Sequence, residues 1–383
     1  MRKIVFLILM ILFVRCKSPV EPIGKNIEVL WKIYDDNPDF IDSRIFSGEG
    51  SIVSDENFFY FHNGMEDDNS RIYKISFDGK IVKVSDAIGR FEDSVLLEAN
   101  DKLYVSLGKR RGIHCLDKNT LEVLWNTPSQ RSSSTLIAND ALTLYEMTGY
   151  SVKAYDLNTG TELWETKEKV GISIKQIGID DDRLYVSTIA NREDGFLYYI
   201  NKHNGEIQKK IILPFIEEYD AQFGGVYRAG TTVYKNSVIV GCNNWHVYSF
   251  DKETGEKKWE FIADAPVSVP ITISDDILYT GTLNGSLYAL DVNTGKMQWK
   301  HRTYGSFAEF PQLYKDKIAF CNGEFYTFNK SGNILEHLKW TESNPYYYNN
   351  IKVNSNGQML VLAYQDEVGN DNDKSLFISI QLN

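Results

Sequence analysis

The sequence predicts an all-β protein, an eight-bladed β-propeller of four-stranded antiparallel blades whose ring is closed by an N-terminal strand. One motif recurs along most of the chain at an interval that suits a single blade. Between its copies lie short runs of β-branched and aromatic residues bounded by Asp, Asn and Gly, which is the pattern of strands and hairpins. Beyond the N-terminus, no stretch keeps a helical period.

The recurring motif is Asp-x-x-Thr-Gly-x-x-x-Trp, which is complete at residues 291–299. Trp259 lies 40 residues before Trp299, and Trp125 lies 39 residues before Trp164. The motif residues that we expect to be structural are Asp117, Trp125, Asp156, Gly160, Trp164, Asp251, Gly255, Trp259, Asp291, Gly295 and Trp299, together with Trp31 near the N-terminus.

Each motif residue has a mechanical role in a turn between two strands. The Asp can accept hydrogen bonds from backbone amides of the turn, and the Gly supplies the positive φ that closes it. The Trp follows on the outer strand, where a large flat side chain can fill the wedge between neighbouring blades. Leu121 replaces the Gly in one copy, and Lys209 replaces the Trp in another. We expect local adjustment at both positions, with the blades retained.

The blades follow one another along the chain, and the sixth has the clearest pattern. It reads as four strands separated by Asp275-Asp276, by Leu283 to Gly285 and by the turn from Asp291 to Gly295. A ring of seven blades stays open as an alternative if one weak unit is irregular. The first seven blades are expected over residues 48–88, 91–128, 132–169, 172–214, 221–264, 266–303 and 306–343.

The eighth blade runs from Tyr346 to Asn383 and lacks an outermost strand. Ile27 to Ile33 can supply this strand, since Trp31 matches the Trp of the motif and the apolar residues alternate with period 2. Pairing of this segment with the last blade would close the ring and remove the exposed edges that invite aggregation.

The first 16 residues have the pattern of a secretory signal peptide. A positive start at residues 2 and 3 precedes the apolar run Ile4 to Val14, which is too short to cross a bilayer, since a membrane helix needs about 20 residues. Cys16 follows in an order that resembles a bacterial lipoprotein signal, although Arg15 stands where that pattern prefers a small residue. A plain secreted protein and an uncleaved anchor therefore stay open. We expect a signal peptide with a lipidated Cys16 over 1–16, a linker over 17–26 and a single propeller domain over 27–383.

Composition and motifs exclude several kinds of chemistry. The net charge of −11 argues against nucleic-acid binding, which favours a basic patch. The six His residues show no metal-ligand spacing, and neither Cys-x-x-Cys nor Gly-x-Ser-x-Gly occurs. We therefore expect no catalytic residue, no metal and no cofactor. The remaining cysteines are expected to be buried free thiols: Cys115, Cys242 and Cys321.

Leu287 to Trp299 carries the signature Leu-Tyr-Ala-Leu-Asp-x-x-Thr-Gly-x-x-x-Trp, which resembles the pyrroloquinoline-quinone-like (quinoprotein alcohol dehydrogenase-like) repeat family. The resemblance covers nearly the whole chain from residue 27 and implies an eight-bladed propeller. That family includes quinone-dependent dehydrogenases and non-catalytic propellers. The alcohol-oxidising members are longer and carry adjacent cysteines, and this sequence has no Cys-Cys pair. The overall plan is similar to that of the outer-membrane assembly lipoproteins, which are anchored eight-bladed propellers.

The connections between blades and those between the two middle strands share one face of a propeller. Acidic and aromatic residues gather in these connections, which suits a peptide or carbohydrate surface because rings present apolar area with little entropy to lose. A second interpretation stays open, in which the acidic loops are merely solvated and the aromatics pack between blades. The candidate binding residues of this face are Tyr219, Tyr227, Trp245, Tyr304, Phe307 and Tyr347.

From the resemblance we expect a monomeric, non-catalytic lipoprotein of the bacterial cell envelope, facing the periplasm or the outer membrane. It would act as a scaffold for envelope proteins, touch the membrane only through its lipid and bind no nucleic acid. The alternatives are a propeller that binds a glycan or small ligand and a quinone-dependent dehydrogenase.

Overall fold

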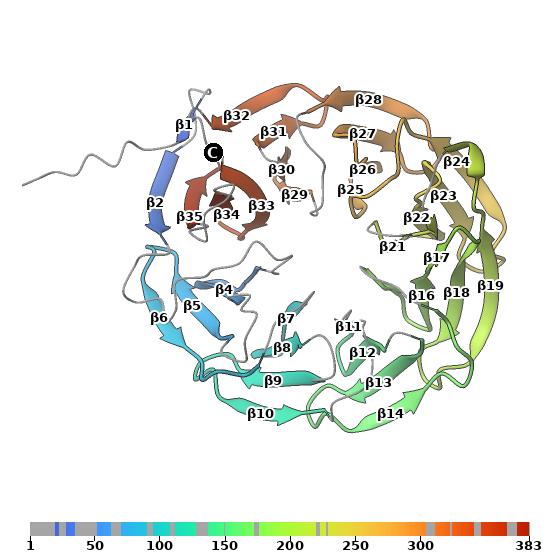
Figure 1. Cartoon of the computed structure of the whole chain (residues 1–383), viewed down its shortest axis with the longest axis horizontal. Helices are drawn as coiled ribbons and strands as arrows, with labels where there is room; N and C mark the ends of the chain where they lie inside the picture. Colours follow the sequence, from blue (N-terminus) through green and yellow to red (C-terminus); the bar gives the residue numbers. More distant parts are fainter. Residues whose placement is uncertain are drawn as a thin grey trace, which may run out of the picture.

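The computed structural model confirms the predicted fold: eight four-stranded antiparallel blades are arranged in a ring around a central axis (Figure 1). One short 3-10 helix, η1 (Glu217–Tyr219), interrupts the described strands. The structure describes residues 20–22, 28–34, 52–62, 70–89, 95–107, 112–127, 137–148, 150–171, 176–219, 223–226, 229–303, 311–321, 324–340, 346–365 and 374–382.

Each blade begins with its innermost strand and ends with its outermost one (Figure 1). In blade 4 a short ribbon, β17 (Ile189–Asn191) paired with β20 (Phe223–Gly225), adds to the four strands. The first four blades are β3 (Val53–Ser54), β4 (Phe58–His62), β5 (Ile72–Ser76) and β6 (Ile81–Val84); β7 (Leu96–Ala99), β8 (Lys102–Ser106), β9 (Ile113–Asp117) and β10 (Val123–Asn126); β11 (Ile137–Asn139), β12 (Thr143–Met147), β13 (Val152–Asp156) and β14 (Glu162–Glu165); and β15 (Gly178–Ile179), β16 (Arg183–Ser187), β18 (Gly195–Asn201) and β19 (Ile207–Leu213).

The last four blades keep the same order, except that the outermost strand of blade 8 comes from the N-terminal part of the chain. They are β21 (Thr231–Tyr234), β22 (Ser237–Gly241), β23 (His246–Asp251) and β24 (Lys257–Ile262); β25 (Thr272–Ser274), β26 (Ile277–Gly281), β27 (Ser286–Asp291) and β28 (Met297–Arg302); β29 (Gln312–Tyr314), β30 (Lys317–Cys321), β31 (Phe325–Asn329) and β32 (Ile334–Trp340); and β33 (Tyr346–Val353), β34 (Gln358–Gln365), β35 (Lys374–Gln381) and β2 (Glu28–Tyr34).

The ring closes as the sequence predicts, because β2 pairs antiparallel with β35. A second N-terminal strand, β1 (Val20–Pro22), lies within the segment expected to be a linker and pairs with the outer edge of β32, with Val20 opposite Trp340. Blade 7 therefore has a fifth strand. No helix among the described residues is long and apolar enough to span a membrane.

Outer-strand Trp residues join blades 2, 3, 5, 6 and 8 to the blade that follows. The Trp125 ring of blade 2 lies against Gly160 in the turn of blade 3, so closely that an added Cβ at Gly160 would come within 2.5 Å of the ring. Trp31 makes the same contact between blades 8 and 1, where the circle of blades closes. It lies against Gly79 of blade 1, and its Nε1 donates to Phe77 O at 2.6 Å. The same contact joins Trp164 to Gly205, Trp259 to Gly295 and Trp299 to Gly332.

The two departures from the motif keep their blade junctions by different means. The aliphatic chain of Lys209 takes the place of a Trp ring and lies against Gly255 of blade 5. Leu121 keeps the left-handed conformation of the missing Gly, with a φ of 57°, and its side chain is buried in a core cluster between blades 1 and 2. Lys83 of blade 1 stands where the motif has Trp, so no Trp side chain occupies the space beside Leu121.

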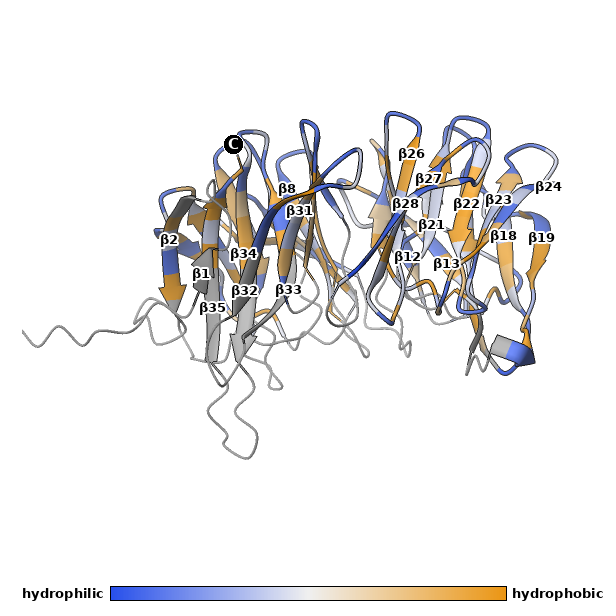
Figure 2. Ribbon diagram, turned by 90° about the horizontal axis from the view of Figure 1, so that it is seen from above, coloured by the Kyte–Doolittle hydropathy of each residue, from blue (hydrophilic) through white to orange (hydrophobic). Residues whose placement is uncertain are grey.

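The turns of the blades divide the molecule into two faces. One face is formed by the turns between strands one and two and by those between strands three and four, and we call it the turn face. The C-terminal end of β35 lies on this face, along the upper edge of Figure 2. The opposite loop face carries the connections between the middle strands, such as Cys242 to Trp245, and those between blades. Cys115, Cys242 and Cys321 are buried thiols.

A buried carboxyl group lies in the core of blade 3. Glu146 is 4% exposed and accepts a hydrogen bond from the Tyr155 hydroxyl at 2.8 Å. Its cross-strand neighbour Lys153 forms ion pairs with Glu162 and Glu165 instead. Burial raises the pKa of Glu146 to about 7, because the ionised form loses its hydration.

We expect Gly160→Ala to lower the free energy of unfolding by about 2–4 kcal/mol, since the new Cβ meets the Trp125 ring and φ is +70°. Gly255→Ala is the matched control, with a φ of +73° but a flexible Lys209 chain as neighbour, and should cost about 1–2 kcal/mol. Urea unfolding measures both variants. Equal losses would show that the Trp contact adds nothing beyond backbone strain.

Glu146→Gln should become more stable relative to the wild type as the pH rises from 5 to 8. The folded-state pKa is about 7, above the value of 4.5 for an unperturbed Glu, so the wild type loses stability as the buried carboxyl group ionises through this window. The amide can still accept from Tyr155 and carries no charge. Urea unfolding across this pH range should show a relative gain of about 2–3 kcal/mol. A pH-independent difference would contradict the assignment.

Candidate functional site

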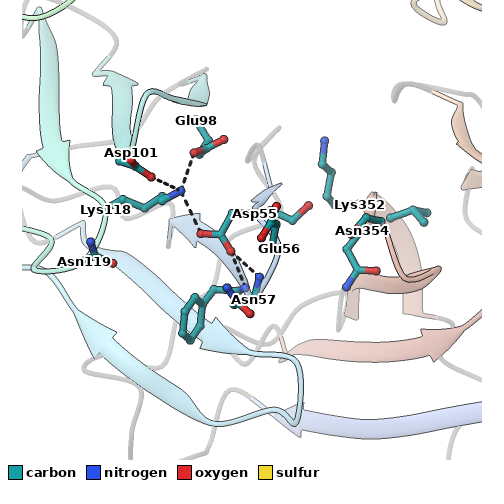
Figure 3. A pocket seen from close by; sticks show the side chains of 13 residues that line it. Asp55, Glu56, Asn57, Glu98, Asp101, Lys118, Asn119, Lys352 and Asn354 are labelled. Carbon is teal, nitrogen blue, oxygen red and sulfur yellow. Dashed lines mark hydrogen bonds and ion pairs between the residues drawn. The ribbon is translucent and has the colours of Figure 1, made fainter.

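A pocket of about 680 Å³ opens on the turn face where blades 8, 1 and 2 meet (Figure 3). One wall comes from the turns of blades 1 and 2, and the other from the turn between β33 and β34 of blade 8. The volume is in the range of small-molecule sites. The lining residues are Ser54, Asp55, Glu56, Asn57, Phe58, Glu98, Asp101, Lys118, Asn119, Lys352, Val353, Asn354 and Ser355.

Three carboxylates of the first wall converge on one ammonium group. Lys118 Nζ lies 2.8 Å from Glu98 Oε1, 3.2 Å from Asp101 Oδ1 and 3.3 Å from Asp55 Oδ2. The Lys118 side chain is only 12% exposed, so its contacts with Asp55 and Glu98 are largely shielded from water, whereas Asp101 is exposed. Burial alone would lower the pKa of Lys118, but its three carboxylate partners raise it above its usual value.

Asp55 ties this ammonium to the backbone of blade 1. Its Oδ1 accepts from the amides of Asn57 and Phe58, each at 2.8 Å, and its Oδ2 accepts from the Tyr60 hydroxyl at 2.9 Å. Burial alone would raise the pKa of Asp55, but these donors and Lys118 outweigh it, and the net shift is downward. Asp55 therefore stays ionised and holds its partners in place.

The same arrangement recurs at two other blade junctions. Asp140 accepts from the Tyr145 hydroxyl and pairs with Lys202, and Asp180 does so with Tyr185 and Lys252. Recurrence at equivalent turns indicates a clamp between blades rather than a reactive centre. Among the described residues, no group of His, Cys, Asp or Glu side chains is placed to hold a metal ion.

The second wall carries a cation that is attracted by Glu98 of the first wall but lies beyond ion-pair distance from it. Lys352 is half-buried and forms no hydrogen bond or ion pair with any residue that the structure describes, and burial lowers its pKa. Asn354 is 5% exposed. Its Oδ1 accepts from the amides of Asn356 and Gln358, while its Nδ2 has no partner within the described part of the chain. Figure 3 shows Lys352 and Asn354 on the side opposite Lys118.

The motif residues lie in the turns and outer strands of the blades. Asp117 Oδ1 accepts from the amides of Asn119 and Thr120, both at 2.8 Å, and the other motif Asp residues make the equivalent contacts with their own turns. Asp117 also directs the chain so that Lys118 enters the pocket wall. The motif thus contributes to the site only through the turn that it shapes.

The candidate residues of the loop face are not brought together by the described structure. Trp245 is half-buried, has a φ of 70° and lies in the turn between β22 and β23. The backbone of Tyr219 ends η1, and that of Tyr347 lies near the start of β33, where we had expected a loop. The remaining calls lie outside the described residues: Tyr227, Tyr304 and Phe307 on the loop face, and the lipidation residue Cys16.

The pocket residues were missed by reasoning from the sequence. Asp55 and Tyr60 belong to an Asp-x-x-x-x-Tyr pattern that recurs at residues 140–145 and 180–185, and a Lys follows the motif Asp or Asn at three junctions. These two signals could have revealed the first wall. Lys352 and Asn354 follow no repeat, so only the fold reveals the second wall.

Comparison with known proteins places this architecture in a family. A family model described as outer membrane protein assembly factor BamB matches residues 68–234 and 243–368. The chain belongs to this family. A 76-residue segment is 30% identical to the outer membrane protein assembly factor BamB of Shewanella oneidensis and covers 20% of this chain and 19% of that protein. A 110-residue segment is 27% identical to the quinohemoprotein alcohol dehydrogenase ADH IIB of Pseudomonas putida, over 24% of this chain and 16% of the enzyme.

Solved structures of a BamB protein and of a methanol dehydrogenase share the fold. BamB from Moraxella catarrhalis has a TM-score of 0.61 at 14% identity, and the match covers 93% of this chain and 100% of the BamB chain. A europium-containing methanol dehydrogenase has a TM-score of 0.69 at 12% identity, with 93% of each chain covered. At these identities the similarity establishes the propeller fold alone. The chain spans less than a fifth of the two curated relatives named above.

Lys118→Ala should lower the free energy of unfolding by about 2–4 kcal/mol, because it leaves the shielded carboxylates of Asp55 and Glu98 without their cation. Lys80→Ala is the control: its ion pair with Asp78 is exposed, and its loss should cost less than about 0.5 kcal/mol. Urea unfolding at constant pH checks both values. A Lys118 variant as stable as the control would exclude the clamp.

Proposed function

We propose that this chain is a non-catalytic scaffold of the bacterial cell envelope that holds protein partners on its propeller faces. The observation that carries the proposal is the match to the assembly-factor family over most of the chain. A closed ring with clamped blades suits this role, since rigid faces lose little conformational entropy when a partner binds. The net charge of −11 favours partners with basic surfaces.

Partner contact is assigned in this proposal to the loop face. Its candidate residues are Tyr219, Tyr227, Trp245, Tyr304, Phe307 and Tyr347, which supply the large rings that protein interfaces favour. The proposal also places a lipid on Cys16, directly after the apolar N-terminal run. β1 supports a short tether, because Val20 is already paired with the rim of blade 7.

A dehydrogenase role has weaker support. The dehydrogenases to which the chain is similar include one quinohemoprotein by name, and this enzyme aligns over only 16% of its length. The carboxylates of the pocket wall recur as clamps at other junctions, which gives them a structural explanation.

A photo-crosslinking amino acid at Trp245, in the full chain expressed in bacteria, should give discrete adducts with envelope proteins. The matched control is Leu163 on β14, which is 53% exposed but lies on the outer rim, and it should give none. Mass spectrometry identifies the adducts. Adducts of equal yield from both positions would contradict a loop-face interface.

Two further measurements test the lipid anchor and the non-catalytic role. Cys16→Ser should release the protein from the membrane fraction without changing its fold, and retention in that fraction would exclude a lipid anchor on Cys16. Turnover of alcohols or sugars after incubation with pyrroloquinoline quinone and calcium would overturn the non-catalytic role.

A further inference from the structure

The turn-face pocket carries opposite charges on its two walls. Lys352 stands on the blade 8 wall without an ion pair to a described residue. Burial lowers its pKa, and the opposing attraction comes from Glu98, which is already paired with Lys118. Removing an ammonium group from water without a partner is unfavourable, so this wall favours an anion. The buried Nδ2 of Asn354 adds a second unsatisfied donor beside it.

The opposite wall favours a cation. Four carboxylates and two ammonium groups line the pocket, so its excess charge is negative. Lys118 is shared by Asp55, Glu98 and Asp101, whereas Glu56 is exposed and forms no ion pair with a described residue. A ligand with only negative charge would meet Lys352 but would be repelled by the carboxylates.

The pocket does not suit stacking of a sugar ring. Phe58 is its single aromatic lining residue, and Lys74 Nζ already lies 4.1 Å from the centre of that ring. The other lining side chains are mostly amides, carboxylates and hydroxyls, which form directional hydrogen bonds with polar groups.

We propose that this pocket binds a small zwitterion of the amino-acid or short-peptide class, with its carboxylate at Lys352 and its ammonium group at Glu56 and the neighbouring carboxylates. This assignment is independent of the scaffold role, because it uses the turn face and needs no partner protein. The volume of about 680 Å³ accommodates a short peptide.

Binding of trialanine to the full chain, measured by calorimetry and ligand-observed NMR at neutral pH, tests the proposal. We expect binding in the millimolar range or tighter, weakened about tenfold when either the amino group is acetylated or the carboxylate is amidated. Lys352→Met should weaken trialanine about tenfold, and Lys352→Arg should restore most of the affinity. Glu56→Gln should weaken trialanine but leave the acetylated peptide unchanged.

Lys296→Met is the matched control, because it removes one exposed charge from a turn of blade 6 and should leave binding unchanged. Urea unfolding verifies that Lys352→Met is folded. We expect no loss of stability, since Lys352 forms no ion pair with a described residue and Glu98 keeps its ion pair with Lys118. Absence of trialanine binding, equal binding of the capped peptides, or equal effects of Lys352→Met and Lys296→Met would each overturn the proposal.

Discussion

Backbone pairing of β2 with β35 joins the two ends of the chain, and the other contacts between blades depend on it. Each blade is a wedge that packs on two neighbours, so an open ring would leave the faces of blades 8 and 1 exposed to water. The pairing also delivers Trp31 to the turn of blade 1, where its Nε1 donates to Phe77 O. Gln358 of blade 8 donates to the same carbonyl, so strand pairing, ring packing and hydrogen bonding meet at one seam.

The junctions between blades combine two kinds of contact that act at different depths. A flat ring over a Gly fills the outer part of the wedge, where the blades splay apart. At three junctions an Asp–Tyr–Lys clamp joins the inner turn of one blade to the outer turn of the next. Together they fix the turns of adjacent blades relative to each other, which is why a pocket shared by three blades can have defined walls.

The fold was predictable because its determinants recur. The spacing of the Trp residues, the Asp and Gly of each turn and the alternation around Trp31 were enough to predict eight blades and the strand that closes them. The compensation at Leu121 was not visible, because it depends on Lys83 of the preceding blade, and contacts between repeats leave no local pattern. The pocket was harder still: Asp55 and Lys352 come from distant parts of the sequence and meet only because the ring closes. Reasoning from loop composition led to the opposite face.

The Trp and the Gly of one junction belong to different blades, and blades 3, 5 and 6 carry one of each. A copy of such a blade inserted into the ring would therefore bring both halves of its new contacts: a Trp for the blade that follows and a Gly for the blade that precedes. Where blade 1 has Lys83 in place of the Trp, blade 2 has Leu121 in place of the Gly, whereas Lys209 of blade 4 still faces Gly255. The repeat can be copied as a self-sufficient unit, and a ring of this kind can grow by whole blades without leaving a mismatched seam.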